Sequence, residues 1–210
     1  MLIDASTYNY CENLSQFWVT QPINVLSNLI FWWAAYTFWI NRDRLIVSQT
    51  KAKILAFLSF MVGLDSAIWH LVGTQWALML DISSIGVFTI ISMYWIFRDR
   101  IKWSRFRSFM VILAVIMAAI TAKDSMPHIF TLNSGAFLPL TAALLIIGGY
   151  MKDKGVFVAG LCLGAGIAFR VLDLASCAYI PFGTHFLWHI FAGFALLLFT
   201  KTLYRKNASS

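Results

Sequence analysis

Charged side chains are scarce in this sequence of 210 residues. Only 12% of the residues are Asp, Glu, Lys or Arg, whereas 60% are hydrophobic. Soluble domains are nearer half apolar and a quarter charged, so the composition argues against a soluble globular protein. Stretches of about 20 mostly apolar residues, the length that crosses roughly 30 Å of hydrocarbon, recur from Pro22 onward. The sequence therefore predicts a polytopic membrane protein without a separate soluble domain.

Two local absences narrow the class of protein further. Residues 1–21 contain no Lys or Arg, whereas a secretory signal peptide begins with basic residues and an early apolar run. We therefore expect no signal peptide and interpret residues 1–21 as an external tail. The last apolar stretch contains no lysine until Lys201 at its very end. Because a Schiff base needs an amine inside the bundle, this absence disfavours a retinal-type photoreceptor.

Hydropathy predicts an all-α bundle of seven transmembrane helices. We place them at residues 22–40, 54–73, 78–97, 107–122, 129–150, 155–178 and 184–203. The transmembrane domain then covers residues 22–204, and residues 205–210 form a short cytoplasmic tail. Small residues in the fifth and sixth helices indicate close packing, because they let helix backbones approach; they are Gly148, Gly149, Gly160, Gly164 and Gly166.

Basic residues are distributed unevenly between the predicted helices. Apart from Lys123 and Arg170, all of the 16 Lys and Arg residues lie after the first, third, fifth or seventh helix. These segments share one side of the membrane, which the positive-inside rule assigns to the cytoplasm. The amino terminus is thus predicted outside and the carboxyl terminus inside. Since topology explains the net charge of +7, we expect no nucleic-acid partner.

Polar side chains gather at one predicted depth of this bundle. Ser66 and His70 are four residues apart and share one face of the second helix. His185 and His189 do the same on the seventh helix, and Asp81 lies near the start of the third. Because the second helix runs outward and the seventh inward, all five lie at a similar level below the outer surface. A charge at mid-depth costs roughly 3 kcal/mol or more, so such a cluster requires a reason.

Three imidazoles beside a carboxylate and a hydroxyl are typical of a catalytic zinc site. Zinc takes three protein nitrogens and keeps a fourth position for water, whose pKa it lowers toward ~7. In this interpretation the metal ligands are His70, His185 and His189. Asp81 would orient the water or accept its proton, and Ser66 would hydrogen-bond a developing oxyanion.

Each of these residues also has a simpler interpretation. A His-x-x-x-His pair can bind haem or hydrogen-bond its neighbours, and Ser66 can bond its own helix backbone. Asp81 can cap the amino terminus of its helix. Arg170 and Asp173, three residues apart on the sixth helix, can form a structural ion pair.

Two cysteines lie on the predicted outer side, Cys11 in the tail and Cys177 near the outer end of the sixth helix. Disulfides persist on that side of a membrane. A bridge between the two cysteines is possible, and it would tie the tail to the bundle.

The motifs around the polar cluster resemble those of the alkaline ceramidase family, within the superfamily that includes the adiponectin-type receptors. The stretch from Gly63 to His70 (GLDSAIWH), with Asp81 after it, is similar to the family's Gly-x-x-Ser-x-x-x-His and later Asp. The stretch 184–193 (THFLWHIFAG) is similar to its His-x-x-x-His motif. The segments 10–12 (YCE) and 24–28 (NVLSN) look like the family as well.

The resemblance implies a metal site and a reaction. His70, His185 and His189 would bind Zn²⁺, and Ser66 and Asp81 would complete a catalytic site. We therefore expect a zinc-dependent amidohydrolase near the extracytoplasmic face, which cleaves a ceramide-like membrane lipid to a fatty acid and a sphingoid base.

The resemblance extends to the external tail, with one departure. It implies a disulfide between Cys11 and Cys177, and Asp173 matches a family aspartate on the sixth helix. Animal members of the family bind calcium near the tail through several acidic residues. The matching residues here are Asn9, Tyr10, Glu12, Asn13 and Gln21. Because calcium prefers charged oxygens and only one of these is a carboxylate, we expect no tight calcium site.

Two other classes of function remain open at this point. One is a non-enzymatic, lipid-sensing receptor of the same superfamily, in which zinc is structural. The other is a haem-binding electron carrier, in which His70 would face His185 or His189 across the iron. The sequence does not indicate an oligomeric state.

Overall fold

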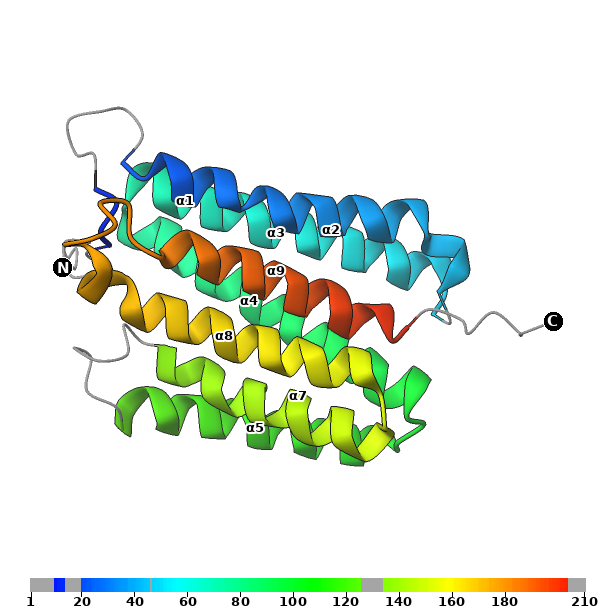
Figure 1. The fold of residues 1–210 in the computed structure, drawn as a ribbon. Coiled ribbons are helices and arrows are strands. Elements are labelled where there is room, and N and C mark those ends of the chain that lie inside the picture. Colours follow the sequence, from blue (N-terminus) through cyan, green and yellow to red (C-terminus); the bar gives the residue numbers. More distant parts are fainter. Residues whose placement is uncertain (1–9, 14–19, 46, 126–133, 204–210) are drawn as a thin grey trace.

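The computed structural model describes residues 10–13, 20–45, 47–125 and 134–203. Within these ranges the chain is mostly α-helical and contains no strand. The main helices are α1 (Pro22–Ser27), α2 (Leu29–Ile40), α3 (Gln49–Val72), α4 (Gln75–Trp95), α5 (Arg105–Ser125), α7 (Leu138–Met151), α8 (Lys154–Ser176) and α9 (His185–Lys201). Short segments extend or join them: η2 (Arg42–Arg44), η3 (Ile96–Arg100) and η4 (Ser134–Phe137). The main helices lie side by side in one bundle (Figure 1).

Six helical segments of the described chain are long and apolar enough to cross a membrane. They are Pro22–Ile40, Gln49–Val72, Gln75–Arg100, Arg105–Lys123, Ser134–Met151 and Lys154–Ser176. These segments correspond to the first six predicted spans, and the first has the predicted limits. The seventh predicted span coincides with α9, which is apolar but has only 17 residues. The chain thus has the helices of a multi-pass membrane protein, while the seventh crossing and the orientation stay predictions.

Some of the sequence predictions concern residues outside the described ranges. These are most of the external tail, residues 129–133 of the fifth predicted helix, and the carboxyl-terminal tail.

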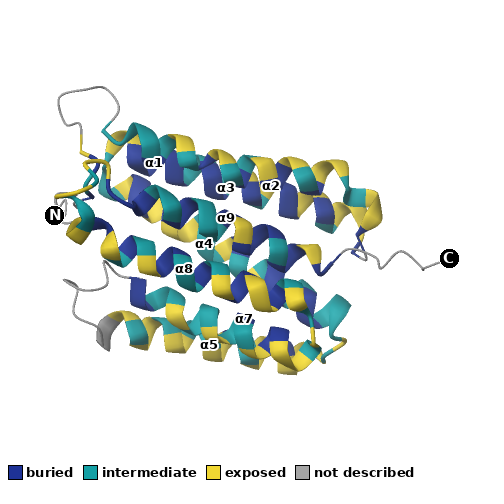
Figure 2. Cartoon of the chain, in the orientation of Figure 1, coloured by how far each residue is buried: buried dark blue, intermediate teal, exposed yellow. Residues whose placement is uncertain are grey.

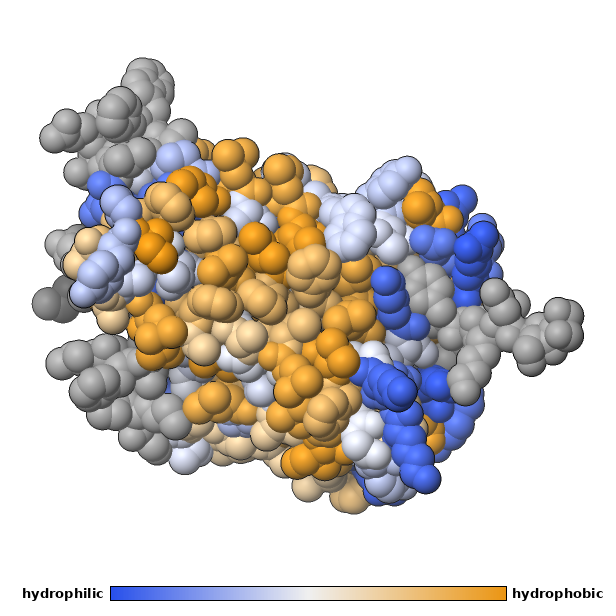
Figure 3. Space-filling view, viewed as in Figure 1, coloured by the Kyte–Doolittle hydropathy of each residue, from blue (hydrophilic) through white to orange (hydrophobic). Residues whose placement is uncertain are grey.

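Apolar side chains cover much of the outer surface. In the apolar stretch of the segment Arg105–Lys123, only 11% of the residues are buried. Phe106 of this segment is 75% exposed, and Ile146 of α7 is 70% exposed. Exposed residues follow the outward sides of the helices, whereas buried residues face the interior of the bundle (Figure 2). The visible face is hydrophobic across its middle and hydrophilic toward the end where the carboxyl terminus lies (Figure 3). Because soluble monomers rarely expose apolar patches of this extent, the surface fits a lipid environment.

The connections between the helices alternate between the two ends of the bundle. The α2–α3, α4–α5 and α7–α8 connections lie at the same end as the carboxyl terminus (Figure 1). These connections, together with the first turns of α3, α5 and α8 that follow them, contain most of the basic residues of the described chain. The one-sided distribution of charge along the sequence is therefore a property of one end of the bundle.

Close helix packing is confirmed between α7 and α8, but only one member of the pair Gly148 and Gly149 takes part in it. A Cβ atom at Gly148 would lie 2.5 Å from the Phe157 backbone nitrogen, and one at Gly160 would lie 2.9 Å from the Leu145 side chain. Nothing lies within 4 Å of a Cβ atom at Gly149. Gly148 is therefore the member of the pair that lets α7 approach α8.

This difference predicts opposite effects for two neighbouring substitutions. Gly148→Ala should lower the stability of the protein by about 1–3 kcal/mol, because the methyl group pushes α7 away from the α8 backbone. Gly149→Ala should leave stability unchanged or raise it slightly, because alanine favours the helix and the site is open. Thermal unfolding of both variants in the same detergent checks this, and equal destabilisation would contradict the packing.

Candidate metal centre

Three histidines from two helices converge near the end of the bundle opposite the basic connections. His70 lies in the last turn of α3, and His185 and His189 lie in the first turns of α9. All three side chains are buried, with at most 2% of their surface exposed. One nitrogen from each ring can be chosen so that all three atoms lie within 4.8 Å of one another. The predicted convergence of these imidazoles is confirmed, and the group could hold a metal ion.

The end of α3 places His70 toward α9. Gly73 ends this helix in the left-handed conformation, with φ of 62°, and its N–H bonds the Trp69 carbonyl. A left-handed cap of this kind is most easily provided by glycine. The Thr20 hydroxyl donates to the carbonyls of His70 and Leu71, at 2.9 and 3.0 Å. These bonds satisfy carbonyls that the helix itself leaves unpaired.

Hydrogen bonds on the outer side of two rings determine which nitrogen carries the proton. His70 Nδ1 lies 2.5 Å from Gln21 Oε1, an amide oxygen that can only accept. His189 Nδ1 lies 2.6 Å from the Ser27 hydroxyl. That hydroxyl already donates its proton to the Asn24 carbonyl at 2.7 Å, so it accepts from His189. In both rings the proton is on Nδ1, and Nε2 presents a lone pair.

The geometry of these lone pairs fits a bound cation. His70 Nε2 and His189 Nε2 are 3.1 Å apart, yet neither has a proton to donate to the other. A tetrahedral ion with metal–nitrogen bonds of roughly 2.05 Å separates two ligand nitrogens by about 3.3 Å. Both ring nitrogens of His185 are buried without a hydrogen-bond partner in the described chain. Buried polar atoms are normally satisfied, and a ligand that accepts lone pairs would give one nitrogen of each of the three rings a partner.

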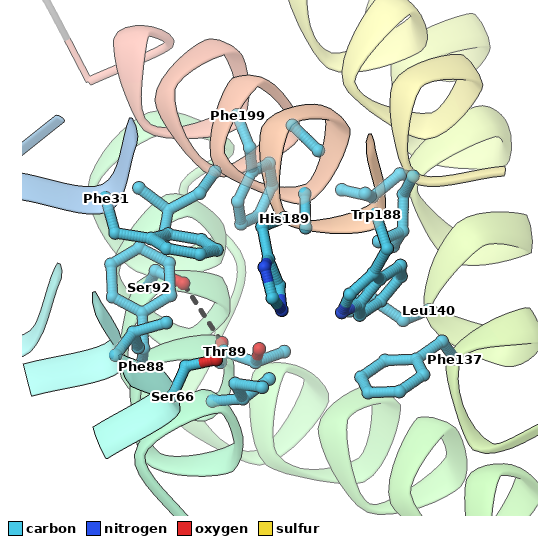
Figure 4. Close-up of a pocket in the computed structure, with 17 residues that line it drawn as sticks. Phe31, Ser66, Phe88, Thr89, Ser92, Phe137, Leu140, Trp188, His189 and Phe199 are labelled. Carbon is cyan, nitrogen blue, oxygen red and sulfur yellow. Dashed lines mark hydrogen bonds between the residues drawn. The ribbon is translucent and has the colours of Figure 1, made fainter. Parts of the chain in front are cut away.

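The predicted carboxylate and hydroxyl lie together beside this cluster. Asp81 and Ser66 are both buried, and their side chains interact. Asp81 Oδ1 has no hydrogen-bond partner among the described residues. Since α4 begins at Gln75 and its cap position is Thr74, Asp81 is not an amino-terminal cap. Ser66 and His189 line the same pocket, into which His189 projects from α9 (Figure 4).

A buried arginine lies close to the whole cluster. Arg170 of α8 interacts electrostatically with Asp81 and with all three imidazoles. Its guanidinium lies over the Trp188 ring, 5.4 Å from the ring centre. Stacking of this kind holds a planar guanidinium in a defined orientation.

Asp173 organises the backbone around His185. Its Oδ1 accepts the backbone N–H groups of Thr184 and His185, at 2.7 and 2.8 Å. Its Oδ2 accepts the N–H of Cys11 at 3.0 Å. A fully buried carboxylate at the start of α9 complements the positive end of the helix dipole. Asp173 therefore joins α8, α9 and the amino-terminal segment, and positions His185.

A disulfide joins the amino-terminal segment to the end of α8. The predicted bond between Cys11 and Cys177 is confirmed, with an S–S distance of 1.98 Å. Gly183 makes this junction possible, because its φ is 65° and a Cβ atom would lie 2.1 Å from Asp173 Oδ1 and 2.6 Å from Cys11 Cβ. No other residue fits this position without a shift of the backbone.

The disulfide holds Tyr10 against the cluster. The Tyr10 ring stacks on the His185 ring with 3.9 Å between centres, and it lies 5.4 Å from the His70 ring. Burial raises the pKa of the Tyr10 phenol, so this side chain is neutral at pH 7. Tyr10 thus covers one side of the histidine cluster.

Two of the residues that match the family's calcium region, Glu12 and Gln21, have other partners in this chain. Glu12 accepts the backbone N–H groups of Ile23 and Asn24, at 2.7 and 2.8 Å, and so caps α1. Burial raises the pKa of Glu12, and these two hydrogen bonds oppose the rise. Gln21 bonds His70. Asn9 lies outside the described residues.

The roles of Gln21, Ser27 and Asp173 were not among the predictions from the sequence. A signal was present for Ser27, since a hydroxyl inside an apolar span requires a partner. Asp173 carried the same signal on the sixth helix. Gln21 lies before the first span, where a polar residue is unremarkable in sequence.

Comparison of the chain with protein-family models, with curated proteins and with solved structures finds no match. The resemblance to the alkaline ceramidases consequently stays a prediction from the motifs.

The cluster predicts that the purified protein contains about one divalent metal ion per chain. His185→Ala removes one of three ligands and should abolish retention of the metal during gel filtration. Ser59→Ala, a buried serine on α3 whose hydroxyl bonds the Leu55 carbonyl, is a control that should retain it. Elemental analysis by mass spectrometry measures both. Equal metal content in the two variants would contradict the site.

The hydrogen bond between Ser27 and His189 predicts that Ser27→Ala weakens metal binding less than His185→Ala does. Loss of the acceptor for His189 Nδ1–H should lower the metal affinity by roughly 10- to 100-fold, because the ring loses its orientation. Competition with a chelator of known affinity measures the change. If the affinity of Ser27→Ala equals that of Ser59→Ala, the hydrogen bond does not support the ligand.

Proposed function

We propose that this protein is a zinc-dependent intramembrane hydrolase that cleaves the amide bond of ceramide-like lipids. The observation that carries the proposal is the group of three buried imidazoles with converging nitrogens, next to the interacting pair Ser66 and Asp81. Zinc is the proposed ion because three neutral nitrogen ligands, with room for one more ligand, are typical of its catalytic sites.

An apolar pocket beside the cluster supports a lipid substrate. Its lining comes from six helices and is almost entirely hydrophobic; it includes Phe31, Val62, Phe88, Leu144, Leu163 and Phe199. The pocket follows α9 from His189 to Phe199, a distance of about 15 Å along the helix axis. An acyl chain in this pocket would place the adjacent amide beside His189 and Ser66 (Figure 4).

The chain would supply a proton carrier and an oxyanion partner for the hydrolysis. A zinc ion on His70, His185 and His189 would supply, when bound, a water of lowered pKa and a Lewis acid for the amide carbonyl. Asp81 Oδ1 would take the proton from the attacking water and return it to the amide nitrogen as the C–N bond breaks. The Ser66 hydroxyl would donate to the carbonyl oxygen. The products are a carboxylic acid and an amine, and one water is consumed.

Burial of the site would help this chemistry. Asp81 and the three histidines are at least nine-tenths buried, so bulk water is excluded from most of their surface. Electrostatic interactions are stronger in such surroundings than in water. Arg170 would compensate the negative charge that Asp81 and the reacting carbonyl share.

One observation favours a second function, a lipid-sensing receptor with a structural metal. Tyr10 covers the cluster, and the disulfide holds the segment that contains it. Such a cover would make the centre a structural element instead of a site open to water. The two functions differ in turnover, which only the hydrolase has.

The haem alternative fits the geometry poorly. Two axial imidazoles must lie on opposite faces of the macrocycle, with the iron between them. The 3.1 Å contact between His70 Nε2 and His189 Nε2 leaves no room for a porphyrin layer between these rings. The His70 and His185 ring centres are 5.1 Å apart, which is also too short for two axial ligands of one iron.

The proposal predicts specific losses of ceramide hydrolysis. His185→Ala should show no turnover, and Asp81→Asn should lose most of it because the amide cannot carry the proton. Ser66→Ala should lower kcat by about 10²- to 10³-fold. Asp65→Asn makes the same chemical change at a carboxylate that interacts with Ser84, and it should remain active.

The assay is release of labelled fatty acid from ceramide by the purified protein in detergent, with zinc removed and then restored. Removal should stop turnover and restoration should recover it. Absence of turnover in a preparation with a full complement of zinc would refute the hydrolase and favour the receptor.

A further inference from the structure

A groove lies between α3, α4 and α5, away from the histidine cluster. It has a volume of about 420 Å³ and is lined by Ile54, Ile90, Ile91, Tyr94, Trp95, Phe109, Ile112, Leu113 and Ile116. Small-molecule sites typically measure roughly 300–1,000 Å³, so the groove is large enough for a ligand. Ile54 and His70 are separated by about 24 Å along α3. This groove is therefore independent of the proposed hydrolase site.

The lining of the groove suits a hydrocarbon chain. All the lining side chains are aliphatic or aromatic, and Phe109 and Leu113 of α5 are 59% and 38% exposed. The α5 segment is the least buried of the six span-length segments of the described chain, so it leaves space beside α4. A polar ligand would lose its hydration here without gaining partners.

Positive charge gathers at one end of this groove. Lys51 lies one turn before Ile54 on α3, Arg98 follows Tyr94 by one turn, and Arg105 precedes Phe109 by one turn on α5. Three different helical segments thus bring a cation to the same end.

The partners of these cations leave a net positive charge. Lys51 pairs with Asp99 at 2.7 Å, and an Arg98 guanidinium nitrogen donates to the Trp103 carbonyl. Arg105 is exposed, and no hydrogen bond or ion pair joins it to another part of the described chain. Of these three cations, only Lys51 is thus paired with a carboxylate.

We propose that this groove binds one anionic glycerophospholipid. Arg105 and Lys51 bind its phosphate, Tyr94 and Trp95 lie at the level of the glycerol, and an acyl chain occupies the groove between α4 and α5. Aromatic side chains with a polar edge suit that level of a bilayer. A second copy of this chain is disfavoured as the occupant, because it would bring the same positive charge.

Native mass spectrometry of the full-length protein tests this assignment. The delipidated protein is mixed with equal amounts of phosphatidylglycerol and phosphatidylcholine that have the same acyl chains, and the bound lipids are counted. We expect one phosphatidylglycerol per chain in preference to phosphatidylcholine. Arg105→Gln should lower this preference about fivefold, because one basic residue usually contributes that factor to binding of an anionic lipid surface. Lys154→Gln, at the start of α8 and outside the groove, removes the same charge and should leave the preference unchanged.

Two further arms separate the lipid from other occupants. Leu113→Trp fills the groove and should prevent binding of both lipids without loss of a charge. Glycerol 3-phosphate offers the headgroup alone and should not compete. Equal retention of the two lipids, displacement by glycerol 3-phosphate, or a dimer in place of a lipid adduct would each overturn the proposal.

Discussion

The arrangement of this protein depends on two imidazole lone pairs that face each other in a buried site. His70 Nε2 and His189 Nε2 are 3.1 Å apart, and their protons are committed to Gln21 and Ser27 on the opposite sides of the rings. Two lone pairs at this distance repel each other unless a cation lies near both. The region of α1 fixes both rings in this arrangement, through Gln21 on His70 and through Ser27 on His189.

The amino-terminal segment is part of the centre. It contributes Tyr10 as a cover, Cys11 as an anchor and Glu12 as the cap of α1. That cap orients the helix whose Ser27 bonds His189. Asp173 joins the same segment to the start of α9 by accepting N–H groups from both. A change in the tail is therefore expected to reach the three histidines through backbone contacts, although the tail provides none of the imidazoles.

Much of this could be predicted from the sequence, because membrane spans and i, i+4 pairs are local patterns. Hydropathy identified the six span-length segments, and the positions of His70, His185 and His189 on oppositely directed helices predicted their common depth.

The tautomers could not be predicted, because they depend on contacts with Gln21 and Ser27 from a third helical segment. Gly148 and Gly149 are equivalent in sequence, and only the position of α8 distinguishes them. From the sequence, Asp173 could equally form an ion pair with Arg170. Its hydrogen bonds with three backbone N–H groups are known only from the structure.

X-ray absorption at the zinc edge of the purified protein would show whether these three imidazoles bind one zinc ion. We expect nitrogen and oxygen ligands alone at roughly 2.0–2.1 Å, with the outer-shell scattering of three imidazole rings. A sulfur ligand near 2.3 Å, or a first shell without imidazole scattering, would contradict it.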